Sequence, residues 1–166
     1  GLPKEQHLSV VLQNSLELEG HNIKIINGSV SGSTSAGGLN IADWTLSENN
    51  IDLMILCLGA NDMLRGINPK ETKNNLEEII KIAKSKNIKI IIAGMIAPTS
   101  YGFEYKKSFD KIFSDLSKKH KLQLIPFLLE GVAQKPEFNL SDGMHPNDQG
   151  TIIIGNTLKK AILKNL

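Results

Sequence analysis

The sequence predicts a single α/β domain, residues 1–166, in which helices cover both faces of a parallel sheet. Strand-like and helix-like segments alternate along the chain, and the strand-like segments are continuous apolar runs without a long linker between them. With 166 residues, of which 40% are hydrophobic and 22% charged, the chain is long enough for one full core and too short for two domains.

Four segments have the composition of buried strands. Each is rich in Ile, Leu or other apolar residues without the alternation of a half-exposed strand. The segments are "NIKIING" at 22–28, "IDLMILCLG" at 51–59, "NIKIIIAGM" at 87–95 and "LQLIPF" at 122–127. We therefore expect all four to be parallel members of one sheet.

Helical spacing of apolar residues predicts the elements between the strands. The patterns cover residues 6–18, 69–84, 104–119 and 147–163. Asn68-Pro69 gives the second of these helices a cap and a first-turn proline. A further helix is expected after the glycine-rich segment 28–38. The resulting order, α-β-α-β-α-β-α-β-α, predicts a three-layer α/β/α sandwich with a parallel, flavodoxin-like sheet.

A domain of this kind normally opens with a strand that lies centrally in the sheet, whereas this chain opens with a turn and a helix. Without that strand its neighbours would leave buried backbone groups unpaired, at about 1–3 kcal/mol each. A few such losses are comparable to the whole stability of a domain, about 5–15 kcal/mol. We therefore expect the natural protein to have a first strand upstream of Gly1.

Composition argues against several classes of function. The net charge is only +2 and the lysines are scattered, so nucleic-acid binding is not expected. The single Cys57 lies in an apolar run, which rules out an internal disulfide and favours a small buried side chain. The sequence has no apolar run near the roughly 18 residues that span a bilayer, so no integral membrane segment is expected.

Four segments are expected at the sheet edge where parallel α/β proteins bind ligands, and three of the four are rich in Gly and small polar residues. Three directly follow predicted strands, and the fourth lies late in the chain. They are "GSVSGSTSAGG" at 28–38, "GANDMLRG" at 59–66, "GMIAPTSYG" at 94–102 and "SDGMHPND" at 141–148. The first lacks the lysine and spacing of a phosphate loop, but it offers backbone N–H groups and close approach at Gly32. Asn61 and Asp62 follow the second strand directly, and either both cap the next segment or Asn61 donates its amide to a developing oxyanion.

Asp142 and His145 are the candidate acid and base. The backbone of His145 is held between Gly143 and Pro146, and Asp142 could accept from its Nδ1 and leave Nε2 facing outward. The alternative is a sharp surface turn without chemistry. A metal site is not expected, because no other His, Cys or carboxylate cluster supplies a third ligand.

Together and in this order, the segments resemble the SGNH hydrolase family, also called GDSL esterases and lipases. Within it they are similar to the bacterial thioesterase/lysophospholipase/arylesterase branch. The resemblance covers nearly the whole chain, in the blocks "GLPKEQ", "NGSVSGSTSAGG", "LGANDMLRGINPKET", "APTSYG" and "SDGMHPND". It implies that Gly32 and Asn61 donate to the oxyanion, and that Asp142 and His145 are the acid and base of a triad.

The family's first block, Gly-Asp-Ser-(Leu/Ile), is absent from this sequence, so the resemblance implies a nucleophilic serine upstream of Gly1. No other serine is expected to replace it, since Ser29, Ser31, Ser33 and Ser35 belong to the glycine-rich loop and Ser141 adjoins the acid. Ala60 stands where the branch often has a second Gly, which should not disturb Asn61. Residues 97–101 match a loop that borders the acyl pocket in relatives.

The resemblance implies a serine hydrolase that cleaves small esters, thioesters or lysolipids, as a monomer and without a metal or organic cofactor. Relatives are usually exported, which suggests the periplasm. The alternative is an inactive domain that binds acyl or glycan ligands, although a protein without activity has no chemical need for all four site residues. A flavodoxin-like nucleotide or receiver domain is disfavoured, because the sequence lacks a phosphate loop and an acidic phosphorylation pocket.

Overall fold

A computed structural model describes residues 3–47 and 50–166. The contacts of the chain divide it into two compact units. The terminal unit comprises Gly1–Asn27 and Leu128–Leu166, and the central unit comprises Gly28–Phe127. Gly1 and Leu2, which begin the "GLPKEQ" block, lie outside the described residues.

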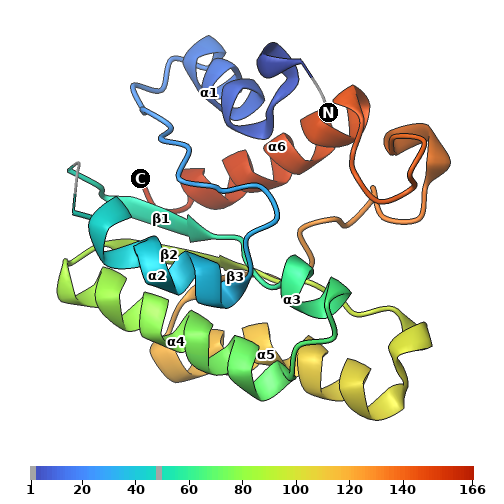
Figure 1. Ribbon diagram of the computed structural model, residues 1–166. Helices are drawn as coiled ribbons and strands as arrows, with labels where there is room; N and C mark the ends of the chain where they lie inside the picture. The colour runs from blue at the N-terminus through green and yellow to red at the C-terminus, as the bar shows by residue number, and fades with distance from the viewer. Residues whose placement is uncertain (1–2, 48–49) are drawn as a thin grey trace. The chain divides into compact units, whose positions relative to one another are not determined.

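The central unit contains a parallel sheet of three strands in the order β1-β2-β3 (Figure 1). The strands are β1 (Leu53–Leu56), β2 (Lys89–Ala93) and β3 (Gln123–Ile125). Each lies inside a predicted apolar run, so three of the four predicted strands and their parallel pairing are confirmed. The observed strands are shorter than the runs because a strand extends only as far as its ladder partner.

The helices of the central unit lie on one face of this sheet (Figure 1). They are α2 (Ser35–Thr45), α4 (Pro69–Ser85) and α5 (Phe103–His120), with the short helix α3 (Ala60–Leu64) and the 3-10 turn Thr99–Tyr101 in the connections. The side chain of Asn68 accepts a hydrogen bond of 3.0 Å from Lys70 N, and Pro69 follows as the first helical residue. The predicted start of α4 is therefore confirmed.

The terminal unit is built on α1 (Leu8–Leu18) and α6 (Asp148–Leu163), with 3-10 turns at Lys4–Gln6 and Pro136–Phe138. The two helices pack side by side (Figure 1), and Gly155 of α6 lies against Leu8 and Val11. Lys159 Nζ donates to Ser15 Oγ at 2.8 Å. Among the helices of residues 3–47 and 50–166, none is both long and apolar enough to span a bilayer.

The prediction of a strand at 22–28 is wrong for the described structure, in which residues 21–30 form no regular element. A β-strand requires a neighbour to pair its backbone groups. Here the side-chain amide of Gln13 takes that role: Ile25 N donates to Gln13 Oε1 at 2.6 Å, and Gln13 Nε2 donates to Ile23 O at 2.7 Å. Ile26 is 45% exposed, as expected for an apolar run without a sheet around it.

One partly buried charge cluster joins α4 to α5. Glu77 accepts from Lys119 Nζ at 2.6 Å and lies 2.7 Å from His120 Nε2. These hydrogen bonds, first from Lys119 and then from His120, lower the pKa of Glu77 from 4.5 to about 2. Because the folded pKa is depressed, the stabilisation is present above pH 4.5 and is lost as the pH falls toward 2.

Replacing Glu77 by Gln is expected to lower the free energy of unfolding by about 1 kcal/mol at pH 7. The difference from the wild-type protein should shrink as the pH is lowered from 5 to 3. Urea unfolding at several pH values measures it. Glu78→Gln is the matched control, since Glu78 pairs with the exposed Lys81 on the same helix, and it should lower the free energy of unfolding by less than about 0.5 kcal/mol. Equal losses in both variants would contradict the prediction.

Candidate active site

A tight turn positions Asp142 and His145 in the terminal unit. Asn139 and Pro146 form an antiparallel bridge, and Leu140 N donates to His145 O at 2.7 Å. Between them, Gly143 N donates to Leu140 O at 2.9 Å, and Gly143 has φ +68°. Only glycine adopts this left-handed conformation without strain, which explains why the acid and base flank a glycine.

Within the turn, Asp142 Oδ2 lies 2.7 Å from His145 Nδ1. Its other oxygen, Oδ1, accepts from Met144 N at 2.9 Å and from His145 N at 3.0 Å. The backbone donors His145 N–H and Met144 N–H, followed by the imidazole, lower the pKa of Asp142 from 3.8 to about 2. An ionised carboxylate at this distance favours a proton on Nδ1, and in the neutral imidazole this leaves Nε2 as the proton acceptor.

Both ends of the segment that carries the turn are anchored by asparagines. Asn139 is buried, and its Nδ2 donates to Val132 O at 2.8 Å and Lys135 O at 2.7 Å. Asn147 caps α6, accepting from Gly150 N at 3.0 Å. The side chain of His145 is nevertheless 70% exposed. The structure therefore combines a fixed backbone with an accessible imidazole.

In the central unit, Asn61 reaches the glycine-rich loop that contains Gly32. Asn61 Nδ2 donates to Ser33 O at 3.1 Å. Gly32 is exposed and has φ +72°, and Thr34 caps α2 by accepting from Gly37 N. Asn61 lies within α3, whose N-cap is Gly59, so the alternative interpretation of Asn61 as a helix cap is wrong.

Sequence reasoning considered Asp62, the neighbour of Asn61, only as a helix cap and missed that it is fully buried. Its carboxylate accepts from Ser35 N at 2.7 Å and from Thr72 Oγ1 at 3.1 Å, and it also accepts from Ser35 Oγ. Asn75 Nδ2 donates to Ser35 Oγ at 3.0 Å. One sequence feature could have indicated a buried polar partner, namely Thr72. It is a polar residue in the buried stripe that continues along α4 through Leu76, Ile79, Ile80 and Ala83.

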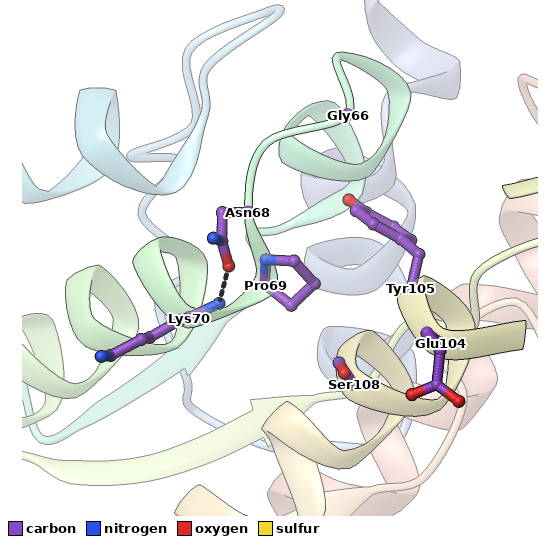
Figure 2. A pocket seen from close by; sticks show the side chains of 7 residues that line it. All are labelled: Gly66, Asn68, Pro69, Lys70, Glu104, Tyr105 and Ser108. Atoms are coloured by element: carbon purple, nitrogen blue, oxygen red, sulfur yellow. Dashed lines mark hydrogen bonds between the residues drawn. The ribbon is translucent and has the colours of Figure 1, made fainter. Parts of the chain in front are cut away.

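An open pocket lies beside the loop between α3 and α4 (Figure 2). Its lining residues are Gly66, Asn68, Pro69, Lys70, Glu104, Tyr105 and Ser108. Tyr105 stacks on Tyr101, which belongs to the predicted acyl-pocket segment 97–101, with 5.4 Å between ring centroids. Its hydroxyl donates to Ile67 O at 2.9 Å and so ties the loop to α5. In the described part of the chain, no group of three or more His, Cys, Asp or Glu residues is arranged to hold a metal ion.

Known proteins share both the sequence and the fold. Residues 4–151 match the GDSL-like lipase/acylhydrolase family. An arylesterase of Vibrio mimicus is 33% identical over 165 residues, which cover 99% of this chain and 82% of that protein. The thioesterase 1/protease 1/lysophospholipase L1 of Escherichia coli (strain K12) is 32% identical over 138 residues, covering 83% of this chain and 66% of that protein. A solved crystal structure of TesA has a TM-score of 0.94 and 31% identity, and the match covers 100% of this chain and 92% of that one.

A parallel α/β fold of this kind, with these relatives, defines the class of SGNH-type carboxylic ester hydrolases. The chain belongs to the GDSL-like lipase/acylhydrolase family. The resemblance stated from the sequence, the fold class and the enzyme class are therefore confirmed. The roles of Gly32, Asn61, Asp142 and His145 remain predictions.

The low pKa of Asp142 can be tested in this chain. Carboxyl ¹³C chemical shifts followed by NMR should give a pKa of about 2 for Asp142. In His145→Ala the value should rise but remain below 3.8, because alanine keeps the backbone N–H that contributes most to the shift. A wild-type pKa of 3.8 would contradict the turn geometry.

Proposed function

We propose that the chain, acting as one domain and as a monomer, hydrolyses small carboxylic esters and thioesters through a Ser-His-Asp triad. Asp142 orients His145, and Nε2 of His145 takes the proton of a serine that lies upstream of Gly1. The serine attacks the acyl carbonyl, and the protonated imidazole then transfers its proton to the leaving group. Gly32 N–H and the Asn61 amide stabilise the oxyanion of the tetrahedral intermediate.

The observation that carries this proposal is the contact of 2.7 Å between Asp142 Oδ2 and His145 Nδ1. A catalytic base must be fixed in tautomer and orientation and must also be accessible to the nucleophile. The carboxylate supports the first requirement, and the 70% exposure of the imidazole supports the second. A turn without chemistry needs the Asp142 bonds to Met144 N and His145 N, but it does not need an imidazole at position 145.

The surroundings of the serines in the glycine-rich loop favour a nucleophile elsewhere. Ser35 is fully buried, and its hydroxyl donates to Asp62 while accepting from Asn75. The hydroxyl of Ser33 donates to Thr34 O at 3.3 Å. Both hydroxyls are thus engaged with groups of the central unit other than an imidazole, the group that activates a serine for attack. These contacts support structural roles for Ser33 and Ser35 and a separate serine with the chemical one.

Two relatives support the proposed range of substrates. One is named an arylesterase, and the other carries thioesterase and lysophospholipase in its name. All three activities transfer an acyl group to water through the same tetrahedral oxyanion, so one constellation of groups serves them. Aryl esters and acyl thioesters with acyl chains of increasing length are therefore the substrates to test first.

Asn61→Ala in the full-length protein, including the residues upstream of Gly1, is expected to lower kcat by about 10²–10³. KM should change little, because the amide acts mainly on charge that develops in the transition state. Steady-state hydrolysis of p-nitrophenyl acetate measures both constants. Asn74→Ala, on the exposed face of α4, is the matched control and should retain full activity. An unchanged kcat in Asn61→Ala would remove Asn61 from the oxyanion site.

The nucleophile and its base can be tested by covalent labelling. The full-length protein should gain one adduct with a fluorophosphonate ester, located by mass spectrometry on a serine upstream of Gly1. His145→Ala should slow labelling by several orders of magnitude, because the serine loses its general base. His21→Ala, which replaces a histidine of the same unit outside the turn, should label at the wild-type rate. An adduct on Ser141 or on a loop serine would contradict the proposed nucleophile.

A further inference from the structure

Three side chains from α3 and its C-cap hold the loop that carries Gly32. Asn61 Nδ2 donates to Ser33 O at 3.1 Å, and Arg65 Nη2 donates to Gly32 O at 2.9 Å. Between them in sequence, Asp62 accepts from the backbone and side chain of Ser35. The helix and the loop are thus joined at three successive points, all inside the central unit.

The Asp62 contact is the buried one. A carboxylate with no exposed surface has lost its hydration and must be compensated by hydrogen bonds. Ser35 and Thr72 supply them, and because Ser35 is the first residue of α2, the charge also lies at a helix N-terminus. Displacing the loop from α3 would remove both Ser35 donors and leave this charge with fewer hydrogen bonds than its burial requires. The contact therefore sets the distance between the two segments.

The Arg65 contact acts on the glycine itself. The guanidinium is exposed and reaches from the end of α3 to the carbonyl oxygen of Gly32. Gly32 has φ +72° and no side chain, so its own packing restrains the peptide planes on either side very little. The charge-assisted hydrogen bond from Arg65 to the Gly32 carbonyl restrains these peptide planes instead.

We propose that Asp62 and Arg65 are positioning residues, which fix the spacing between the Gly32 N–H and the Asn61 amide as one oxyanion-binding unit. This inference rests on the proposed function of Gly32 and Asn61. Oxyanion donors act when they lie about 2.7–3.1 Å from the developing charge, and a misplacement of about 1 Å can cost about 10² in rate. Neither positioning residue needs to touch the substrate.

Replacement of Arg65 gives the clearer test, because the Arg65 side chain is exposed. Asp62→Asn would alter a buried acceptor and would therefore also lower the stability of the fold. In the full-length protein with p-nitrophenyl acetate, Arg65→Ala should lower kcat about tenfold while KM changes less than about twofold. Arg65→Lys should restore part of the loss. Lys81→Ala, which removes an exposed cation that pairs with Glu78, is the control and should leave kcat unchanged.

A double-mutant cycle separates positioning from a general structural role. Once Asn61 is replaced by Ala, the spacing between two donors no longer matters, so Arg65→Ala should cost less than about threefold in that background. Equal losses with and without Asn61, or an unchanged kcat in Arg65→Ala, would overturn the positioning role. An unchanged kcat in Asn61→Ala alone would instead overturn the oxyanion assignment, which distinguishes the failure of the proposed function from the failure of this inference.

Discussion

Burial of the Asp62 carboxylate constrains how the central unit can be assembled. An unhydrated charge is tolerated only where several donors meet it, and here they come from the start of α2 and from α4. The carboxylate itself belongs to α3, directly after Asn61. Three separate segments must therefore meet at one point. This meeting point also fixes the position of the glycine-rich loop, because Ser35 belongs to the loop and stands only three residues after Gly32.

Pairing of backbone groups explains where the sequence and the structure differ most. The run at 22–28 has the composition of a strand, yet composition supplies no neighbour, and the ladder of a strand comes from its neighbours. Gln13, ten to twelve residues away, satisfies part of that backbone with its side-chain amide. In the central unit, β2 has a neighbour on each side and is buried over most of its length. Strand propensity thus described the residues at 22–28 correctly, but it did not predict the fold there, because it does not supply a pairing partner.

Local rules predicted the helices closely. Observed α4 is Pro69–Ser85 against a predicted 69–84, and observed α5 is Phe103–His120 against 104–119. The apolar stripe and the caps that determine such elements lie within the segment itself. The Asp62 cluster could not be predicted in the same way, because Ser35 and Asp62 are 27 positions apart. Only Thr72, polar within a buried stripe, indicated that a partner was required.

The two parts of the candidate site also differ in whether their contacts lie within one segment or join distant segments. Asp142 and His145 meet across three positions around a left-handed glycine, so their contact follows from the turn alone, and their side chains are 42% and 70% exposed. Asn61 and Gly32 depend instead on contacts between distant segments, one of them fully buried. Substitution of His145 should therefore affect activity with little effect on stability. At Gly32 and Asn61, activity and folding are coupled, because the buried carboxylate of Asp62 that holds their segments together also contributes to the stability of the fold.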